Sequence, residues 1–409
     1  MDKHCDRRGI NRSGPKIKEK ALIYLDNSAT TRQYDEVNSA MLSAMTDTFG
    51  NPSSLHRLGL ASEKAVKAAR ADIADAIGVS PAEVYFTACG TESDNTALFG
   101  TARAKRRTGK RIITTKVEHP AILEPCKRLE SEGYDIVRLD VDGEGFVSAD
   151  AVADALTEDT VLVSIMAVNN ESGCIMPIEE IGRRIRAYNK DHGTGILFHS
   201  DMVQSFGKVR FNMDLIDMAS FSAHKIHGPK GIGALYVKKG VNIEPFLLGG
   251  GQEQHFRSGT ENVPSIIGFG TAAKKSSSEF ERRTKAMENA KQRLLSGIKD
   301  RVDNIRVNTP EHDSACSVLN ISFIGTRGEV ILHTLEQSEI YVSTGSACSS
   351  NHSSKGGSHV LRAMGLKPNE VEGAIRFSFS EFNTAEEMDT VIEAVAAAVE
   401  KFRKLGSFR

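Results

Sequence analysis

The sequence lacks the features that mark several specialised classes of protein. No run of 18 or more apolar residues occurs in its 409 residues, which excludes an ordinary membrane-spanning helix. The first twenty residues are polar and basic and have no apolar stretch that a secretory signal needs, and their acidic residues count against a transit peptide. We therefore expect a cytoplasmic protein with a flexible N-terminal tail at 1–20.

The sequence also lacks a large excess of positive or negative charge, and it lacks closely spaced pairs of cysteines. Lys plus Arg number 52 against 53 for Asp plus Glu, so nothing favours a protein that binds nucleic acid or a membrane. The six cysteines form no CxxC pair, and a chain of this size needs no disulfides, which suits a reducing cytosol. Most of these cysteines are therefore interpreted as small buried hydrophobic residues, with Cys348 as the exception.

Length and a hydrophobic content of 40% favour two domains. Short β-branched runs alternate with helical patterns, which predicts an α/β fold with a mostly parallel sheet. Glycines 249–251 and the stretch 257–264 interrupt this alternation, so we predict a large domain at 21–264 and a smaller α+β domain at 265–409. Strands are expected at 22–26, 84–87, 111–116, 135–140, 160–168, 196–201, 218–222, 233–237, 317–323, 340–343 and 374–379.

Lys225 lies in a turn directly after an apolar strand, within the stretch SFSAHKIHGPKG at 220–231. The glycines that follow allow the backbone to approach another group closely. A partly buried lysine with a lowered pKa is a good nucleophile toward an aldehyde cofactor. On its own, however, such a lysine is more often a solvated turn residue.

Asp201 ends the predicted strand at 196–201, and Gln204 follows it by three residues. A carboxylate in that place can keep a pyridinium nitrogen protonated, and the amide of Gln204 can bind a ring oxygen. An aspartate at the end of a strand is also a common helix cap. The pair therefore gains meaning only together with Lys225.

A third element is the turn TACGTESDN at 87–95, which contains Gly90 and Thr91 between a strand and a helical pattern. The N-terminus of the helix would present backbone N–H groups and a hydroxyl to a phosphate. A plain capping motif is the alternative. Ser222 and His224 flank Lys225 and can add further donors.

These elements stand in the order expected for one site, and the chain resembles the cysteine desulfurases of the class V aminotransferase family from Ile23 to about Arg403. The resemblance implies a fold type I pyridoxal-phosphate enzyme with a seven-stranded sheet. The stretches that carry it are IYLDNSATT at 23–31, GNPSSLHRLG at 50–59, FTACGTESDN at 86–95, EHPAIL at 118–123, VNNESGCIMPI at 168–178, FSAHKIHGPKG at 221–231, RSGTENVP at 257–264, STGSACSS at 343–350 and IRFSF at 375–379.

The resemblance also implies a role for each matching residue. Lys225 would carry pyridoxal 5'-phosphate in the large domain, with His119 stacked on the ring as a catalytic residue. Asp201 would bind the pyridine nitrogen, and Gln204 the ring hydroxyl. The phosphate contacts would be Gly90, Thr91, Ser222 and His224, joined by Thr260 from the second subunit of a homodimer, and the substrate contacts would be Asn27, Asn170 and Arg376.

Cys348 lies in a stretch rich in Ser and Gly that has no apolar face, so we expect an exposed loop. An exposed thiol can ionise, although by residue type alone a loop cysteine is usually just a surface thiol. The resemblance implies that Cys348 takes sulfur from L-cysteine as a persulfide, releases L-alanine and passes the sulfur to an acceptor for iron–sulfur assembly or tRNA and cofactor thiolation. No resident metal is expected, apart from transient iron–sulfur ligation by Cys348.

Cys89 departs from the family pattern, since many relatives have glycine there. We expect it to be a packing residue rather than a second catalytic thiol. Two alternatives to a desulfurase stay open: a selenocysteine lyase or aminotransferase of the same fold, and a silent binding protein. The presence of Lys225, Asp201 and Cys348 counts against the silent protein, whereas the choice of sulfur acceptor and the preference between cysteine and selenocysteine are not decided by the sequence.

Overall fold

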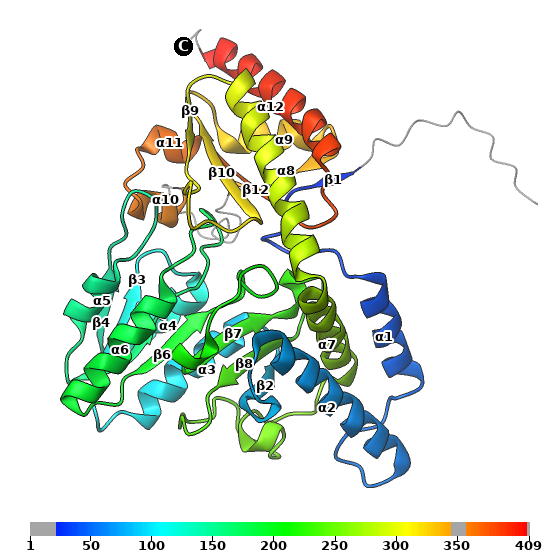
Figure 1. Ribbon diagram of the computed structural model, residues 1–409, viewed down its shortest axis with the longest axis vertical. Coiled ribbons are helices and arrows are strands. Elements are labelled where there is room, and N and C mark those ends of the chain that lie inside the picture. Colours follow the sequence, from blue (N-terminus) through cyan, green and yellow to red (C-terminus); the bar gives the residue numbers. More distant parts are fainter. Residues whose placement is uncertain (1–21, 345–356, 407–409) are drawn as a thin grey trace, which may run out of the picture.

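The computed structural model describes residues 22–344 and 357–406, so the predicted tail and Cys348 lie outside the described residues. Its centre is a seven-stranded sheet in the order β2-β8-β7-β6-β5-β3-β4, in which β8 runs in the opposite direction to the other six strands. The prediction of a mostly parallel sheet is therefore confirmed (Figure 1). The strands are β2 (Val84–Thr87), β3 (Arg111–Thr115), β4 (Asp135–Leu139), β5 (Thr160–Ser164), β6 (Leu197–Asp201), β7 (Met218–Ser222) and β8 (Gly233–Val237).

Helices cover both faces of this sheet because successive strand residues point to opposite sides. Ile113 and Val163 belong to the core shared with α2, α6 and α7, whereas Ile112 and Leu162 belong to the core shared with α3 and α4. The helices of this part are α1 (Asp35–Thr46), α2 (Arg57–Ile77), α3 (Gly90–Ala104), α4 (Pro120–Ser131), α5 (Ala149–Ala155), α6 (Ile178–His192) and α7 (Val263–Ser278).

A smaller sheet forms the C-terminal part, with antiparallel strands in the order β12-β10-β9. Two long helices, α8 and α12, pack against each other and share its core. The elements are α8 (Phe280–Arg301), β9 (Ile305–Val307), β10 (Val318–Phe323), α9 (Gly328–Glu336), β11 (Ile340–Tyr341), α10 (His359–Ala363), α11 (Pro368–Glu372), β12 (Ala374–Ser378) and α12 (Ala385–Gly406).

The packing crosses the predicted domain limits at both ends. Strand β1 (Ile23–Tyr24) pairs in parallel with β11, and Ile23 and Leu25 lie in the core of the C-terminal part. Helix α7 packs instead on α1 and α2, and α8 then leads into the C-terminal part (Figure 1). Local patterns cannot reveal pairing between segments more than 300 residues apart.

The strand directions bring three loops to one edge of the large sheet. Strands β6 and β7 are parallel, and β2 shares their direction because both β2 and β7 are antiparallel to β8. Asp201 is the last residue of β6, and the segments after β2 and β7 carry Gly90 and Lys225. The carboxyl ends of strands are where open α/β sheets usually place a ligand.

Among the helices at 22–344 and 357–406, none combines the length and the apolar character that a membrane span needs.

Candidate active site

A cavity of about 290 Å³ lies at this edge of the sheet. It brings together residues that are far apart in the sequence and that come from both parts of the chain. The predicted site residues that line it are Gly90, Thr91, His119, Asn170, Asp201, Gln204, Ser222, His224, Lys225 and Arg376. Its other lining residues are Ser28, Ala29, Cys89, Asp94, Pro120, Met166, Val168, Glu171, Val203, Ser358 and His359.

Lys225 ends a short 3-10 turn, Ala223–Lys225, that directly follows β7. Its Nζ donates hydrogen bonds to two backbone carbonyls, 2.5 Å to Ser28 O and 2.7 Å to Ala29 O. These two carbonyls fix the position of the amine in the cavity. This geometry suits an amine that must reach a bound aldehyde.

Asp201 and Gln204 form the end of the cavity next to β6. The Oδ1 atom of Asp201 accepts a hydrogen bond of 2.9 Å from the N–H of Val203. Burial raises the pKa of Asp201 to about 6, against the opposing effects of this hydrogen bond and of Lys225. Gln204 donates from Nε2 to Ser28 O, and its buried Oε1 has no hydrogen-bond partner among residues 22–344 and 357–406.

The start of α3 also lines the cavity. Its N-cap residue, Cys89, makes no side-chain capping bond, so backbone N–H groups of the first turn stay available to an anion. The buried Oγ of Ser222 has no hydrogen-bond partner in the described part of the chain. His224 Nδ1 lies 3.2 Å from Thr30 Oγ1, and burial, together with neighbouring lysines, lowers the pKa of His224 to about 4.

His119 is the N-cap of α4, and its Nδ1 accepts a hydrogen bond of 3.1 Å from the N–H of Ala121. Burial lowers the pKa of His119 to about 4, helped by Lys225 and His359, so the ring is neutral at pH 7. Because Nδ1 is an acceptor, the single ring proton of the neutral form sits on Nε2. The ring can therefore donate or exchange a proton at Nε2.

Arg376 enters the cavity from β12 of the C-terminal part. It donates 2.7 Å to Asp26 Oδ1 and 3.1 Å to Asn170 O, while its buried Nε has no hydrogen-bond partner within the described ranges. Only 4% of the residue is exposed. A guanidinium that is already oriented by two fixed partners can recognise a planar carboxylate.

Two predicted residues lie outside this cavity. Asn27 is buried, and its amide donates to Tyr24 O at 3.1 Å and to Ser378 O at 2.9 Å, beside a different cavity. Thr260 is exposed and borders a small pocket with Thr87 and Ala88. The substrate contact of Asn27 and the phosphate contact of Thr260 stay predictions, as does the role of Cys348.

The structure adds buried carboxyl groups to which the sequence prediction gave no role. Asp94 lines the cavity with its Oδ1 3.7 Å from His199 Nε2, and burial and the charge of Asp201 raise the pKa of Asp94 well above its usual range. Burial also raises the pKa of Glu118 to about 8. Glu171 accepts a hydrogen bond of 2.5 Å from Ser358 Oγ. Asp94 stands inside the quoted stretch FTACGTESDN, but its convergence with Asp201 is visible only in the fold.

Burial disfavours the reactive thiolate form of three of the described cysteines. Burial raises the pKa of Cys126 to about 12 and that of Cys316 to about 11, and it also raises the pKa of Cys174. Cys89 borders the cavity at the start of α3. Within residues 22–344 and 357–406, no group of three or more His, Cys, Asp or Glu side chains is arranged to hold a metal ion.

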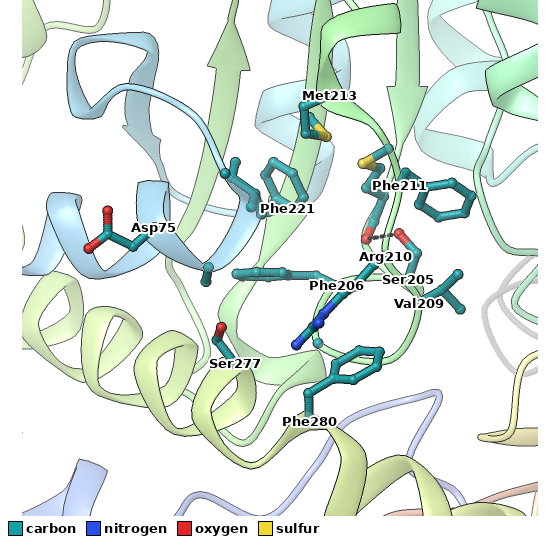
Figure 2. A pocket seen from close by; sticks show the side chains of 15 residues that line it. Asp75, Ser205, Phe206, Val209, Arg210, Phe211, Met213, Phe221, Ser277 and Phe280 are labelled. Atoms are coloured by element: carbon teal, nitrogen blue, oxygen red, sulfur yellow. Dashed lines mark hydrogen bonds between the residues drawn. The ribbon is translucent and has the colours of Figure 1, made fainter.

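A second cavity, of about 270 Å³, lies beside the segment that follows β6 and beside the junction of α7 and α8. Figure 2 shows the rings of Phe206, Phe211, Phe221 and Phe280 around it. None of the predicted site residues lines this cavity. Phe221 directly precedes Ser222, so this aromatic packing supports the strand end that carries the candidate site.

The resemblance predicts that the start of α3 holds the phosphate of pyridoxal phosphate, so Gly90→Ala is expected to weaken binding of this predicted cofactor about tenfold, since overpacking costs about 1–3 kcal/mol. A Cβ atom at Gly90 would stand 2.7 Å from Val203 Cγ2 and 3.6 Å from Ser222 Cβ, inside the space beside the unpartnered Ser222 hydroxyl. Titration of cofactor-free protein with pyridoxal phosphate measures the change. Gly143→Ala, whose Cβ would meet only Met364 O at 4.0 Å, is the control and should bind normally. Equal affinities for both variants would contradict the placement of the phosphate at Gly90.

Comparison with known proteins gives consistent matches over nearly the whole chain. Residues 23–391 match the family described as aminotransferase class-V. The chain is 44% identical over 391 residues to a cysteine desulfurase from Trichormus azollae, covering 95% of this chain and 96% of that protein. It is 43% identical over 389 residues to the cysteine desulfurase IscS of Methanosarcina thermophila, covering 95% of this chain and 94% of that one.

Two solved structures are also similar. A NifS-like protein has a TM-score of 0.86 and 39% identity, and the match covers 93% of this chain and 100% of that chain. The structure of SspA in complex with cysteine has a TM-score of 0.76 and 35% identity, and the match covers 87% of this chain and 98% of that chain.

Proposed function

The chain belongs to the aminotransferase class-V family and is a cysteine desulfurase, and from this premise we propose how its residues divide the reaction. Pyridoxal 5'-phosphate is bound at Lys225, L-cysteine is converted to L-alanine, and the sulfur is transferred to Cys348. The observation that carries the proposal is the convergence of Lys225, Asp201 and Arg376 on one cavity. These are an amine, a carboxyl and a guanidinium that the sequence places on separate elements.

Two unpartnered polar atoms in the cavity support the proposed cofactor. Gln204 Oε1 and Ser222 Oγ are buried polar atoms without hydrogen-bond partners among the described residues. They face the same cavity as Asp201 and the start of α3, so a polar ring and a phosphate would satisfy them. A cationic pyridine nitrogen beside Asp201 would favour the ionised carboxylate, which burial alone disfavours. When bound, pyridoxal phosphate supplies an electron sink for the negative charge that develops at the substrate Cα.

The residues of the chain bind the substrate and move its protons. Arg376 and Asn170 hold the substrate carboxylate, and Asp26 and the Asn170 carbonyl orient the guanidinium. Lys225 removes the Cα proton, since its amine is held over the cavity by the Ser28 and Ala29 carbonyls. His119 exchanges protons at Nε2, because its Nδ1 is occupied by the Ala121 N–H.

Cys348 accepts the sulfur. Its thiolate attacks the substrate sulfur, so that an S–S bond forms while the bond between sulfur and the substrate Cβ breaks. The electron pair of that broken bond stays on the carbon skeleton, which takes up protons and leaves as L-alanine. The balanced reaction is one L-cysteine and one thiol giving one L-alanine and one persulfide.

The proposal includes a homodimer and a sulfur acceptor in the cytoplasm. Large apolar side chains are exposed on α1, on the segment between α1 and α2 and at the start of α2, which supports a protein interface there, and they are Leu42, Met45, Phe49, Leu55 and Leu58. Thr260 is exposed, as a contact to a second subunit requires. The acceptor is an iron–sulfur scaffold or a thiolation carrier that takes the persulfide directly from Cys348.

Product analysis tests the proposed function. The cofactor-loaded protein is expected to convert L-cysteine to L-alanine and, with a reductant, to release an equal amount of sulfide. The reason is that the persulfide is the second product and a thiol reduces it. Alanine and sulfide are quantified over the same time course. Formation of pyruvate and ammonia, or of a keto acid without sulfide, would contradict desulfuration and indicate elimination or transamination.

A further inference from the structure

The turn that carries Lys225 contains a histidine in an unusual backbone conformation. His227 has φ 65°, in the left-handed region that non-glycine residues rarely adopt. The turn is tight, because the N–H groups of Ile226 and Gly228 both donate to Ala223 O. A residue persists in this conformation only where its surroundings hold it there.

The segment before α1 provides part of that hold. Thr31 Oγ1 accepts from the N–H of His227 at 2.8 Å, and His227 O accepts from the N–H of Tyr34 at 3.1 Å. The ring donates from Nδ1 to Arg32 O at 2.7 Å, since a carbonyl can only accept. It also stacks on Tyr34 with the ring centroids 4.5 Å apart.

The C-terminal part holds the other side of the same ring. His227 Nε2 lies 3.2 Å from Glu381 Oε2, a contact that is an ion pair when the imidazole is protonated. Phe382 meets the ring edge-on at 5.4 Å between centroids. Both residues follow β12, the strand that carries Arg376 into the candidate site.

Glu381 is itself firmly anchored. Its Oε1 accepts from Arg283 Nε at 2.9 Å and from the hydroxyl of Tyr34. The side chains of Glu381 and Arg283 are only 2% and 1% exposed. Although burial opposes ionisation, His227 and Arg283 hold the pKa of Glu381 well below its usual range. Breaking one partner out of such a buried ionic group is costly.

We infer that His227 is a positioning residue that ties the Lys225 turn to Glu381, so that the lysine amine is placed relative to Arg376 on the C-terminal part. This inference rests on the proposed role of Lys225. The two parts of the chain contribute the proton acceptor and the carboxylate-binding group, respectively. His227 follows Lys225 by two residues, and its partner Glu381 follows Arg376 by five residues, so their contact links the segments that carry the two groups.

His227→Asn tests the inference, because Asn tolerates the left-handed backbone but cannot reach Glu381 in the same way. We expect cofactor-free His227→Asn to bind added pyridoxal phosphate about tenfold more slowly than the natural protein. The rate of binding is measured by visible absorbance. We also expect kcat for cysteine to fall more than KM changes. The matched control is His333→Asn. The His333 side chain is 72% exposed and lies 3.2 Å from Glu336, so this variant should behave like the natural protein.

A double-mutant cycle with Glu381→Gln separates positioning from a general loss of structure. If His227 acts through Glu381, adding His227→Asn to the Glu381→Gln protein should slow cofactor binding by less than a further threefold. The reason is that both changes remove the same contact. Fully additive effects, or unchanged capture by His227→Asn, would overturn the inference. His227→Gln provides a second variant if either protein unfolds, as judged by circular dichroism, and should recover part of the rate. Failure of the natural protein to capture the cofactor would instead overturn the proposed role of Lys225.

Discussion

Lys225→Ala is expected to lose the visible absorbance of the bound cofactor and to slow cysteine turnover by at least roughly 10³-fold, within the range for removal of a proton-transfer group. In the proposed mechanism, the change removes both the amine that carries the cofactor and the base that takes the Cα proton. The carbonyls of Ser28 and Ala29 would remain, and the Gln204 side chain that also donates to Ser28 O is an amide, which cannot replace the amine. Absorbance after dialysis and initial rates of alanine formation measure the two losses.

Lys230→Ala is the control for this prediction. Lys230 is exposed and lies on the same loop, five residues further on, so its loss changes local charge without removing the amine from the cavity. We expect its absorbance and rate to stay within about threefold of the natural protein, as is usual for surface substitutions. A Lys225→Ala protein that kept covalently bound cofactor would identify a different lysine as the carrier.

Cys348→Ser is expected to abolish persulfide formation and to reduce cysteine turnover by at least about 10²-fold, a lower bound from the removal of catalytic nucleophiles. The substitution replaces a thiol by a hydroxyl of similar size, which cannot attack sulfur to form a disulfide bond. Cofactor absorbance should be unaffected, since Lys225 and its partners are unchanged. Rates of alanine formation and detection of sulfane sulfur on the protein provide the measurement.

Cys89→Ser is the matched control for Cys348→Ser. Cys89 borders the cavity and is the N-cap of α3, a place where serine is a favourable residue. We therefore expect Cys89→Ser to keep both activity and persulfide. Loss of the persulfide in Cys89→Ser but not in Cys348→Ser would identify Cys89, beside the cavity, as the sulfur acceptor.

Part of the fold follows from local sequence patterns. The ranges 84–87, 218–222 and 233–237 are predicted with the bounds that β2, β7 and β8 have, because each is a short, mostly apolar run with a charged residue directly beside it, Glu83, Asp217 or Lys238. The alternation of strands and helices likewise predicts the mostly parallel sheet. The strand order does not follow from these patterns, because it depends on contacts between distant segments.

The N-terminal strand illustrates this limit. Ile23 and Leu25 look like the first strand of the large domain, but they are buried in the core of the C-terminal part. The ladder between β1 and β11 joins residues 23 and 340. Only the closed tertiary structure makes this pairing favourable.

The candidate site shows the same division. Lys225, Asp201 and the Gly90 turn have recognisable local chemistry, and the cavity unites them with His119 and Arg376. Asp94 and Glu118 stand inside the quoted stretches FTACGTESDN and EHPAIL, but the burial and the neighbouring charge of Asp201 that raise the pKa of each carboxyl are visible only in the fold. His227 is also inconspicuous in the sequence, because its partners lie nearly 200 residues before it and more than 150 after it.

The central claim is the transfer of sulfur from L-cysteine to Cys348 by a cofactor held on Lys225. The most direct measurement is a single turnover of the cofactor-loaded protein with sulfur-labelled L-cysteine, followed by alkylation, digestion and mass spectrometry without reductant. We predict one labelled sulfur on the peptide that contains Cys348 for each L-alanine released, and none in Lys225→Ala. Alanine formation with the label on another cysteine, or free as sulfide while Cys348 stays unmodified, would contradict the account.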